Sequence, residues 1–421
     1  MKRSLFSHWF CPILLALFLL LGLSSRPTQA NAFLFQLNNE GLTLISDNRL
    51  QLGPVTFFLS PWLYTEQNHT IFGVKEGGVD LGLGAFHLIA GRQLNFFGPG
   101  RYIFPLLAPL GEGLTAEGLD QVAYSFATQR LSYKKLYAWV PVQKKFRLLL
   151  GQRATYALGP FTFGFGETAL VNEDTPDIYL LPLPLVPVGL YQHLAGNYLE
   201  LPEAKGAINL LAGFDVTLRL GPNAKIYAGY LIDELPLPFW PEDPSDKAGT
   251  ILEPGQYPWK VGCQAGGEWN RPLGIDGLKF FTEYTRINQY TYTAPDPFFN
   301  YTYKGRTLGG PLGPDSDQLN LELMTTGHDT WEFSLLYSRR RQGEGRIGDQ
   351  WTNQPDQTHV FLTGTVETTA QFALTAVKTM GLTGSDQVAL TLSLARITNT
   401  DHQPGIISFQ PEVSVVGKVS W

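Results

Sequence analysis

Cysteine and recognisable metal-binding patterns are almost absent from this sequence. Two cysteines occur among 421 residues, and Cys11 lies in a short N-terminal segment, which leaves Cys263 as the single cysteine beyond it. An intrachain disulfide framework in the remaining chain is therefore excluded. Neither a CxxC nor an HExxH pattern is present, so the sequence predicts no metal site, and we expect no cofactor.

The sequence also has few basic residues and few signs of a domain boundary. The chain carries 31 lysine and arginine residues against 37 aspartate and glutamate residues, a net charge of −6. Proteins that bind nucleic acid usually carry a basic excess, so no nucleic-acid partner is expected. No linker, charge block or low-complexity segment divides the chain. A soluble chain of this length would normally split into domains, whereas a membrane barrel escapes that limit because its outer wall faces lipid.

The N-terminus has the three parts of a secretory signal peptide. Lys2 and Arg3 give a positive start, residues 12–23 (PILLALFLLLGL) are apolar, and Ala30-Asn31-Ala32 is a small-x-small cleavage site. The apolar run is shorter than the roughly 20 residues that cross a bilayer as a helix. We therefore expect residues 1–30 to be a signal peptide and residues 31–421 to form one secreted domain.

Apolar and polar residues alternate along much of the remaining chain, whereas helical periodicity is hard to find. Period-two alternation places the apolar side chains on one face of a β-strand. Asp215 and Arg219 alternate with apolar residues and would be costly against lipid, so their face must be the lumen of a barrel. A Gly221-Pro222-Asn223 turn joins two such segments into a hairpin. The clearest alternating segments are 161–166, 214–220, 226–232, 331–338 and 387–395.

The chain ends on a strand of the same kind with a terminal aromatic residue. Val413, Val415, Val419 and Trp421 fall on one face of this last segment. Such an ending resembles the sorting signal that the bacterial barrel-assembly machinery reads. Together with the signal peptide, it indicates a protein of the outer membrane of a diderm bacterium, in contact with outer-membrane lipid and with that machinery.

These patterns predict an all-β fold, a single antiparallel transmembrane β-barrel. The 44 glycines, 29 prolines and abundant aromatic residues suit short strands, turns and interfacial girdles. A transmembrane strand takes ~9–11 residues, so the chain has room for roughly 16–18 strands. Proline removes a ladder donor, so four Pro-rich segments are expected to be loops or inward-folded elements. They are residues 98–113, 181–190, 235–258 and 294–317.

Several short motifs resemble the capsule-assembly proteins of the Wzi family. The resemblance lies in residues 91–101 (GRQLNFFGPGR), in Glu283-Tyr284-Thr285 followed by 301–309 and 314–317, and in 197–200 with 213–215. It implies an outer-membrane barrel that holds surface polysaccharide, in effect a membrane lectin. Members of that family carry a helical plug ahead of the barrel. Residues 33–52 leave little room for one here, because strand-like sequence begins near Val55.

Tyrosine and arginine clusters are the candidate glycan-binding residues. Aromatic faces stack on the C–H surfaces of sugars, and arginine makes bidentate contacts with carboxylates. The alternative is an interfacial girdle for the tyrosines and a solvated loop or lipid-headgroup contact for the arginine run. The candidates are Arg101, Tyr102, Arg286, Tyr290, Tyr292, Tyr301, Tyr303, Arg306, Arg339, Arg340 and Arg341.

The expected function is therefore non-enzymatic binding and attachment of capsular or other surface polysaccharide. The alternative is a passive porin for sugars or small solutes. An outer-membrane hydrolase is a third hypothesis, resting on His328-Asp329, Asp401-His402 and lumenal carboxylates such as Glu253 and Glu283. Adjacent residues of a strand point to opposite faces, so neither His–Asp pair forms a dyad unless it lies in a loop.

Overall fold

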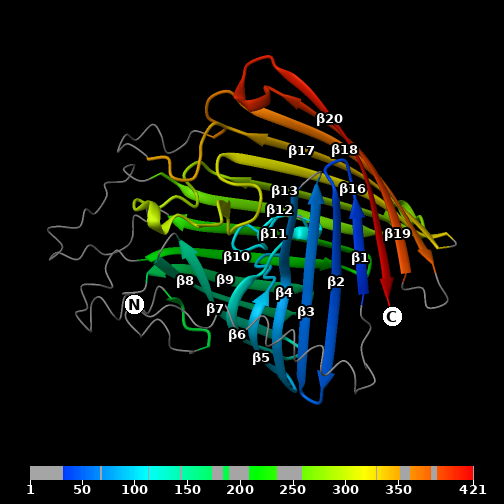
Figure 1. Cartoon of the computed structure of the whole chain (residues 1–421). Helices are drawn as coiled ribbons and strands as arrows, with labels where there is room; N and C mark the ends of the chain where they lie inside the picture. The colour runs from blue at the N-terminus through cyan, green and yellow to red at the C-terminus, as the bar shows by residue number, and fades with distance from the viewer. Residues whose placement is uncertain are drawn as a thin grey trace.

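The computed structural model is a closed antiparallel β-barrel of 18 strands (Figure 1). It describes residues 32–66, 69–111, 113–142, 145–172, 184–188, 208–234, 258–328, 330–350, 361–380 and 386–420. The predicted signal peptide, Trp421 and the segment 235–257 lie outside these residues and stay predictions. Among the residues that the structure describes, no helix is long and apolar enough to cross a membrane.

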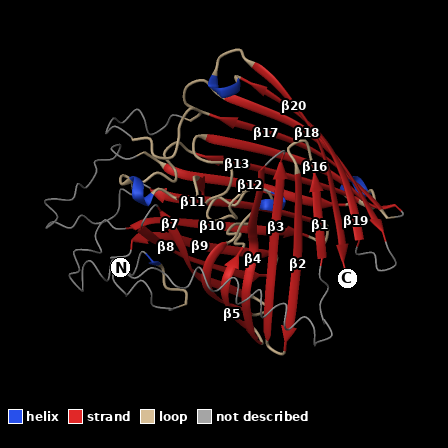
Figure 2. Ribbon diagram, in the orientation of Figure 1, coloured by secondary structure: helices blue, strands red, loops and turns tan. Residues whose placement is uncertain are grey.

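The strands follow one another around the barrel in chain order, as the ribbon in Figure 2 shows. They are β1 (Ala32–Leu37), β2 (Leu42–Leu52), β3 (Val55–Glu66), β4 (His69–Leu83), β5 (Phe86–Gln93), β6 (Leu119–Ala127), β7 (Leu131–Val142), β8 (Lys145–Leu158), β9 (Phe161–Asn172), β10 (Ile208–Leu220), β11 (Ala224–Glu234), β12 (Lys260–Asn270), β13 (Leu278–Ile287), β16 (Ser316–His328), β17 (Trp331–Gln342), β18 (Glu367–Met380), β19 (Asp386–Thr398) and β20 (Ile407–Ser420). A small separate hairpin consists of β14 (Thr302–Tyr303) and β15 (Arg306–Thr307), and the described 3-10 turns are Gly113–Thr115, Pro272–Gly274, Pro297–Phe299 and Thr400–His402.

The barrel closes where β1 pairs with both β2 and β20. Phe35 is opposite Leu44 on β2 and opposite Gly417 on β20. A side chain at Gly417 would collide with the Phe35 ring, so glycine allows the ring to lie across the closing strand. The predicted all-β barrel is confirmed, and its 18 strands are the upper end of the predicted range. The expectation that strands begin near Val55 is wrong, because residues 33–52 already form most of β1 and β2.

The two faces of the wall have the polarity that the alternation predicts. Phe163, Phe333 and Leu392 point outward, and each is nearly half exposed. Asp215 shares the inner face, as expected, and its carboxylate accepts two hydrogen bonds from Arg153 of β8, at 2.7 and 3.1 Å. Lipid therefore meets an apolar band, while the buried ion pair stays inside the barrel.

Short turns and long connections gather at opposite ends of the barrel. The β2–β3, β8–β9 and β10–β11 connections are tight turns, whereas the connections after β5, β9, β11, β13 and β17 are much longer. Barrels of this type have short periplasmic turns and longer extracellular loops. The long connections therefore mark the extracellular end, and the C-terminal end of β20 is periplasmic.

One piece of a long connection lies on the outer face of the wall. Residues 184–188, here called the strap, cover part of β7 to β10, where Val186 and Val188 pack against outward-facing Leu150 and Ala169. The strap also contacts polar groups: the Val188 amide donates to Glu167, at 2.8 Å, and Gln152 donates to the Val186 carbonyl, at 2.9 Å. Glu167 is on the same face as Phe163, so this carboxylate is outside the lumen but covered by protein.

Candidate functional site

The lumen is narrowed by a loop that runs inward between β5 and β6 (Figure 1), here called the inner loop (residues 94–111 and 113–118). Its attachment point is Glu283 of β13, which has no exposed surface. The Glu283 carboxylate accepts the backbone N–H groups of Arg101, Tyr102 and Ile103, at 2.7, 3.2 and 3.0 Å. Tyr227 donates a fourth hydrogen bond, at 2.6 Å. A turn of backbone donors is thus fixed to a single carboxylate on the wall.

A second inward connection, residues 288–315, packs on the inner loop. The hydroxyl of Tyr292 donates to the Pro105 carbonyl, at 2.6 Å, and that of Tyr301 donates to the Leu106 carbonyl, at 2.8 Å. The two tyrosine rings stack with centroids 5.8 Å apart. Burial raises the pKa of Tyr292, which keeps its hydroxyl a donor. The two connections therefore form one apolar body inside the barrel.

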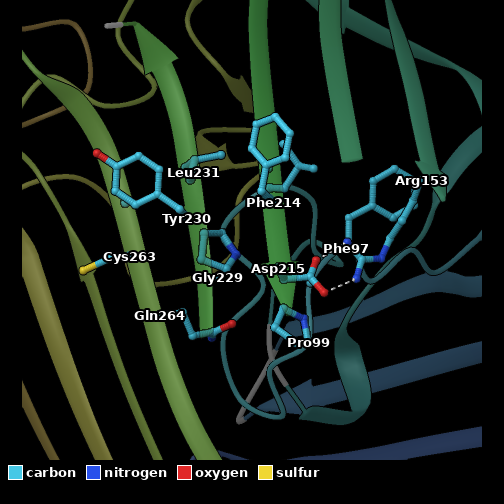
Figure 3. A pocket seen from close by; sticks show the side chains of 15 residues that line it. Phe97, Pro99, Arg153, Phe214, Asp215, Gly229, Tyr230, Leu231, Cys263 and Gln264 are labelled. Atoms are coloured by element: carbon cyan, nitrogen blue, oxygen red, sulfur yellow. Dashed lines mark hydrogen bonds and ion pairs between the residues drawn. The ribbon is translucent and has the colours of Figure 1, made fainter. Parts of the chain in front are cut away.

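Glycines on the wall let this body come close. The Cβ of an alanine at Gly166 would lie 2.5 Å from Leu106, and one at Gly213 would lie 3.2 Å from it. Figure 3 shows the space that remains between the turn at Pro99 and the wall near Asp215. Its volume is about 30 Å³, which holds a water molecule or two but no solute.

The contrast in burial around the lumen shows where water can reach. On β7 to β10, inward-facing Leu136, Leu149 and Leu211 are fully buried under the two inward connections. On β17 to β20 many inward-facing side chains are partly exposed serine, threonine and glutamine, with charged Glu332, Glu412 and Lys418 among them. Hydrogen bonds link them across strands, such as Gln371 to Ser393, at 3.2 Å. The accessible part of the lumen therefore lies along β17 to β20, against a polar surface that also carries charged side chains.

Arg101 and Tyr102 lie on the side of the inner loop that faces this accessible part. The Arg101 guanidinium forms an ion pair with Glu322 of β16, at 2.9 Å, and lies 5.0 Å from the centre of the Phe281 ring. Its side chain is 42% exposed, while that of Glu322 is 8% exposed. Tyr102 donates to the same carboxylate, at 2.8 Å. The exposed Arg101 guanidinium thus borders the accessible part of the lumen, and its ion pair with Glu322 holds it in place.

The remaining tyrosine and arginine candidates are distributed over three environments. Tyr290, Tyr292, Tyr301 and Tyr303 are all buried, so they serve packing within the second connection and present no ring face to a ligand. Arg306 is exposed beside Gly111. Arg286, Arg339 and Arg341 lie on the outer face, whereas Arg340 shares the inner face with Gln318. The candidates therefore do not form one site.

Among the described residues, the His–Asp pairs and the lumenal carboxylates do not come together as a catalytic site. His402 contacts Arg346 and the Thr365 carbonyl within loop structure, and the Asp401 amide donates to Glu367. Glu283 is occupied by backbone donors. The side chains of His328-Asp329 and Glu253 lie outside the described residues. Within the described part of the chain, no group of three His, Cys, Asp or Glu residues could hold a metal ion.

Sequence reasoning missed the residues that position the inner loop. Gln264 and Glu322 were not singled out, and Tyr227 was considered only as part of a family motif, although Gln264 donates to the Ile103 carbonyl, at 2.8 Å. The available signal was that each is a polar residue on the inner face of an alternating strand. It was too common along the chain to distinguish these three from ordinary lumen residues.

The fold is similar to those of solved outer-membrane barrels. OccAB2 of Acinetobacter baumannii is 8% identical, with 93% of this chain and 96% of that chain covered and a TM-score of 0.53. OccD3 (OpdP) of Pseudomonas aeruginosa is 10% identical, with 93% and 90% covered and a TM-score of 0.52. OpdL of the same organism is 11% identical, with 93% and 97% covered and a TM-score of 0.50. No protein-family model matches the sequence, and no curated protein sequence matches it either.

The chain is an outer-membrane β-barrel, and the expected membership of the Wzi family is wrong. The similar structures are Occ and Opd proteins rather than capsule-assembly proteins, so the expected attachment of surface polysaccharide is wrong as well. The motifs misled because they are short and serve packing. Gly98-Pro99-Gly100 is the turn of the inner loop that packs against the wall, and Glu283 attaches the residues that follow it. Recognition of Val413, Val415 and Val419 by the assembly machinery stays a prediction; all three lie on the outer face of β20.

Proposed function

We propose that this barrel is a passive, non-enzymatic channel that admits small solutes across the outer membrane. The observation that carries the proposal is the asymmetry of the lumen. The inner loop and residues 288–315 fill the side along β6 to β13, and a half-exposed polar wall faces them on β17 to β20. A fixed obstruction with a hydrated surface opposite it restricts passage by size without closing the barrel. The porin-like fold neighbours support the same function.

The polar wall and Arg101 indicate which solutes the channel favours. Serine, threonine and glutamine exchange hydrogen bonds with hydroxyl and amide groups, so the wall suits small polar solutes. Arg101 adds one exposed positive charge on the opposite side. The passage therefore suits small hydroxylated or zwitterionic solutes better than apolar ones.

The test is conductance of the purified barrel in a planar bilayer, together with swelling of proteoliposomes in solutes of increasing size. We expect discrete ion-conducting steps, and swelling rates that fall steeply with solute size. A barrel that shows the heat-dependent gel mobility of a folded protein, yet gives neither current nor swelling, would refute the proposal. Cleavage of lipid or glycan by the same preparation would show that the non-enzymatic part is wrong.

A further inference from the structure

Two exposed arginines lie on the outer face of the barrel without partners among the described residues. Arg339 of β17 and Arg396 of β19 are exposed, and neither makes a hydrogen bond or ion pair with any residue that the structure describes. Both belong to the outward-facing row, because Ala370 of β18 lies opposite each of them. This row continues to Phe409, which is 62% exposed. The two guanidinium groups therefore emerge from the wall that meets lipid.

Strand geometry places the pair around a shallow notch. Arg339, Ala370 and Arg396 are opposite one another on β17, β18 and β19, which are three adjacent strands. Neighbouring strands are about 4.8 Å apart, so the two arginine Cα atoms are separated by about 10 Å. The small side chain of Ala370 forms the floor between them. Two long side chains can therefore converge over the floor on one anionic group.

The depth of the pair matches the outer-leaflet headgroups. Arg339 is three residues from the extracellular end of β17, and Arg396 is two residues from that of β19. Directly below them, toward the membrane centre, lie Tyr337, Phe372 and Leu394 in matching register. The Tyr337 and Phe372 rings are 4.9 Å apart. Charge thus lies immediately above an apolar band, as an amphipathic lipid requires.

A third arginine extends the positive region but is already neutralised. Arg341 follows Arg339 on the same face and forms an ion pair with Asp317, which also accepts from Tyr284. Arg339 and Arg396 have no such acid beside them among the described residues. Five N–H donors on each guanidinium fit phosphate oxygens in a bidentate manner. The patch therefore offers ten unused donors at the height where anionic headgroups occur.

We propose that Arg339, Arg396 and the Ala370 floor bind a phosphate group of an outer-leaflet glycolipid, with its acyl chains on Tyr337, Phe372 and Leu394. This site is outside the lumen and independent of solute passage. Its ligand is a phosphorylated lipid because the charged notch and the apolar surface are continuous. A free phosphate ion would use the notch alone and gain nothing from the rings.

The test is titration of the folded barrel, in zwitterionic detergent, with fluorescently labelled lipid A that carries two phosphates. We expect the Arg339→Gln/Arg396→Gln variant to bind about 30-fold more weakly, since each arginine near an anionic surface contributes about fivefold. The matched control is Lys378→Gln. Lys378 is also basic and outward-facing on β18, but it lies at the periplasmic end over Trp331, at 4.9 Å. Its affinity for lipid A should match that of the wild type.

Wild-type measurements keep the proposal testable even if the double variant fails to fold. Dephosphorylated lipid A should bind at least tenfold more weakly than the phosphorylated form, and added salt should weaken binding of the phosphorylated form. Equal affinity for the two lipids, or an unchanged affinity in the double variant, would overturn the proposal. Complete displacement by millimolar inorganic phosphate would also overturn it, because the site would then bind free phosphate.

Discussion

Removing the Glu283 carboxylate should release the inner loop and widen the channel. Glu283 accepts three backbone N–H groups of residues 101–103 and the Tyr227 hydroxyl in a site with no exposed surface. Each hydrogen bond to a charged group contributes about 1.5–3 kcal/mol, and an unsatisfied buried donor costs about 1–3 kcal/mol. Because bonds that share an acceptor are not additive, we expect Glu283→Ala to weaken loop attachment by about 5 kcal/mol.

Such a loss exceeds what is needed to change the position of the loop. A difference of about 1.4 kcal/mol changes an equilibrium tenfold, so even a third of the expected loss would populate detached conformations. The contacts left to the tip of the loop include the Gln264–Ile103 bond, the Tyr102–Glu322 bond and the Arg101–Glu322 ion pair. The loop should therefore leave the wall intermittently while the barrel strands keep their pairing.

Single-channel recording in planar bilayers measures this directly. Glu283→Ala should give a larger mean conductance and more current noise than the wild type, with unchanged heat-dependent gel mobility. The matched control is Glu268→Gln on β12, a lumenal glutamate that pairs with Lys225 and does not accept from the backbone of the inner loop. Wild-type conductance and noise in Glu283→Ala would refute the view that this carboxylate holds the constriction.

Three further changes test other parts of the barrel. Replacing Arg101 by alanine should shift the reversal potential in a salt gradient toward that of a more cation-selective channel. One charge about 7 Å from the ion path changes local ion concentrations about threefold in water. An unchanged reversal potential would place Arg101 away from the ion path. Asp215→Asn should lower the free energy of unfolding in urea, measured in vesicles, by about 3 kcal/mol, since it leaves Arg153 buried without its partner. The double variant Asp215→Asn/Arg153→Met should recover most of this loss. Replacing the strap (184–188) by glycine and serine should lower the stability against urea by about 2 kcal/mol, because it exposes Glu167 to lipid. Adding Glu167→Leu should restore that stability. Unchanged stability in the strap variant would mean that the strap does not shield this carboxylate.

The fold was predictable because lipid imposes a strict rule on each strand. Every residue of a transmembrane strand faces either lipid or lumen, so Phe163, Phe333 and Leu392 alternate with polar neighbours for a physical reason that the sequence displays directly. The start of the barrel was missed because β1 is only six residues long, Ala32–Leu37, and follows the predicted cleavage site. A short strand next to an apolar signal segment shows too few alternations to be recognised.

The interior was predictable only in outline. The proline-rich segments 98–113 and 294–317 do leave the wall as expected, although Ser316 and Asp317 already belong to β16. Their docking depends on contacts between residues far apart in the chain, such as Arg101 with Glu283. Alternation places Glu283 in the lumen but cannot say which backbone donors it meets. For that reason a carboxylate considered as a catalytic acid proved to be an attachment point for a loop.

Charge on the outer wall follows depth and cover, which alternation alone does not distinguish. Glu167 and Lys135 face outward near the middle of β9 and β7, and both are almost completely buried. In contrast, Arg339 and Arg396 face outward at the extracellular end and are exposed. A charge in the apolar band is costly and needs protein over it, whereas one at the rim meets headgroups and water. The strap and the arginine notch therefore satisfy the same constraint in two ways. Outward-facing charge lies either where protein covers it or where an anionic partner can reach it.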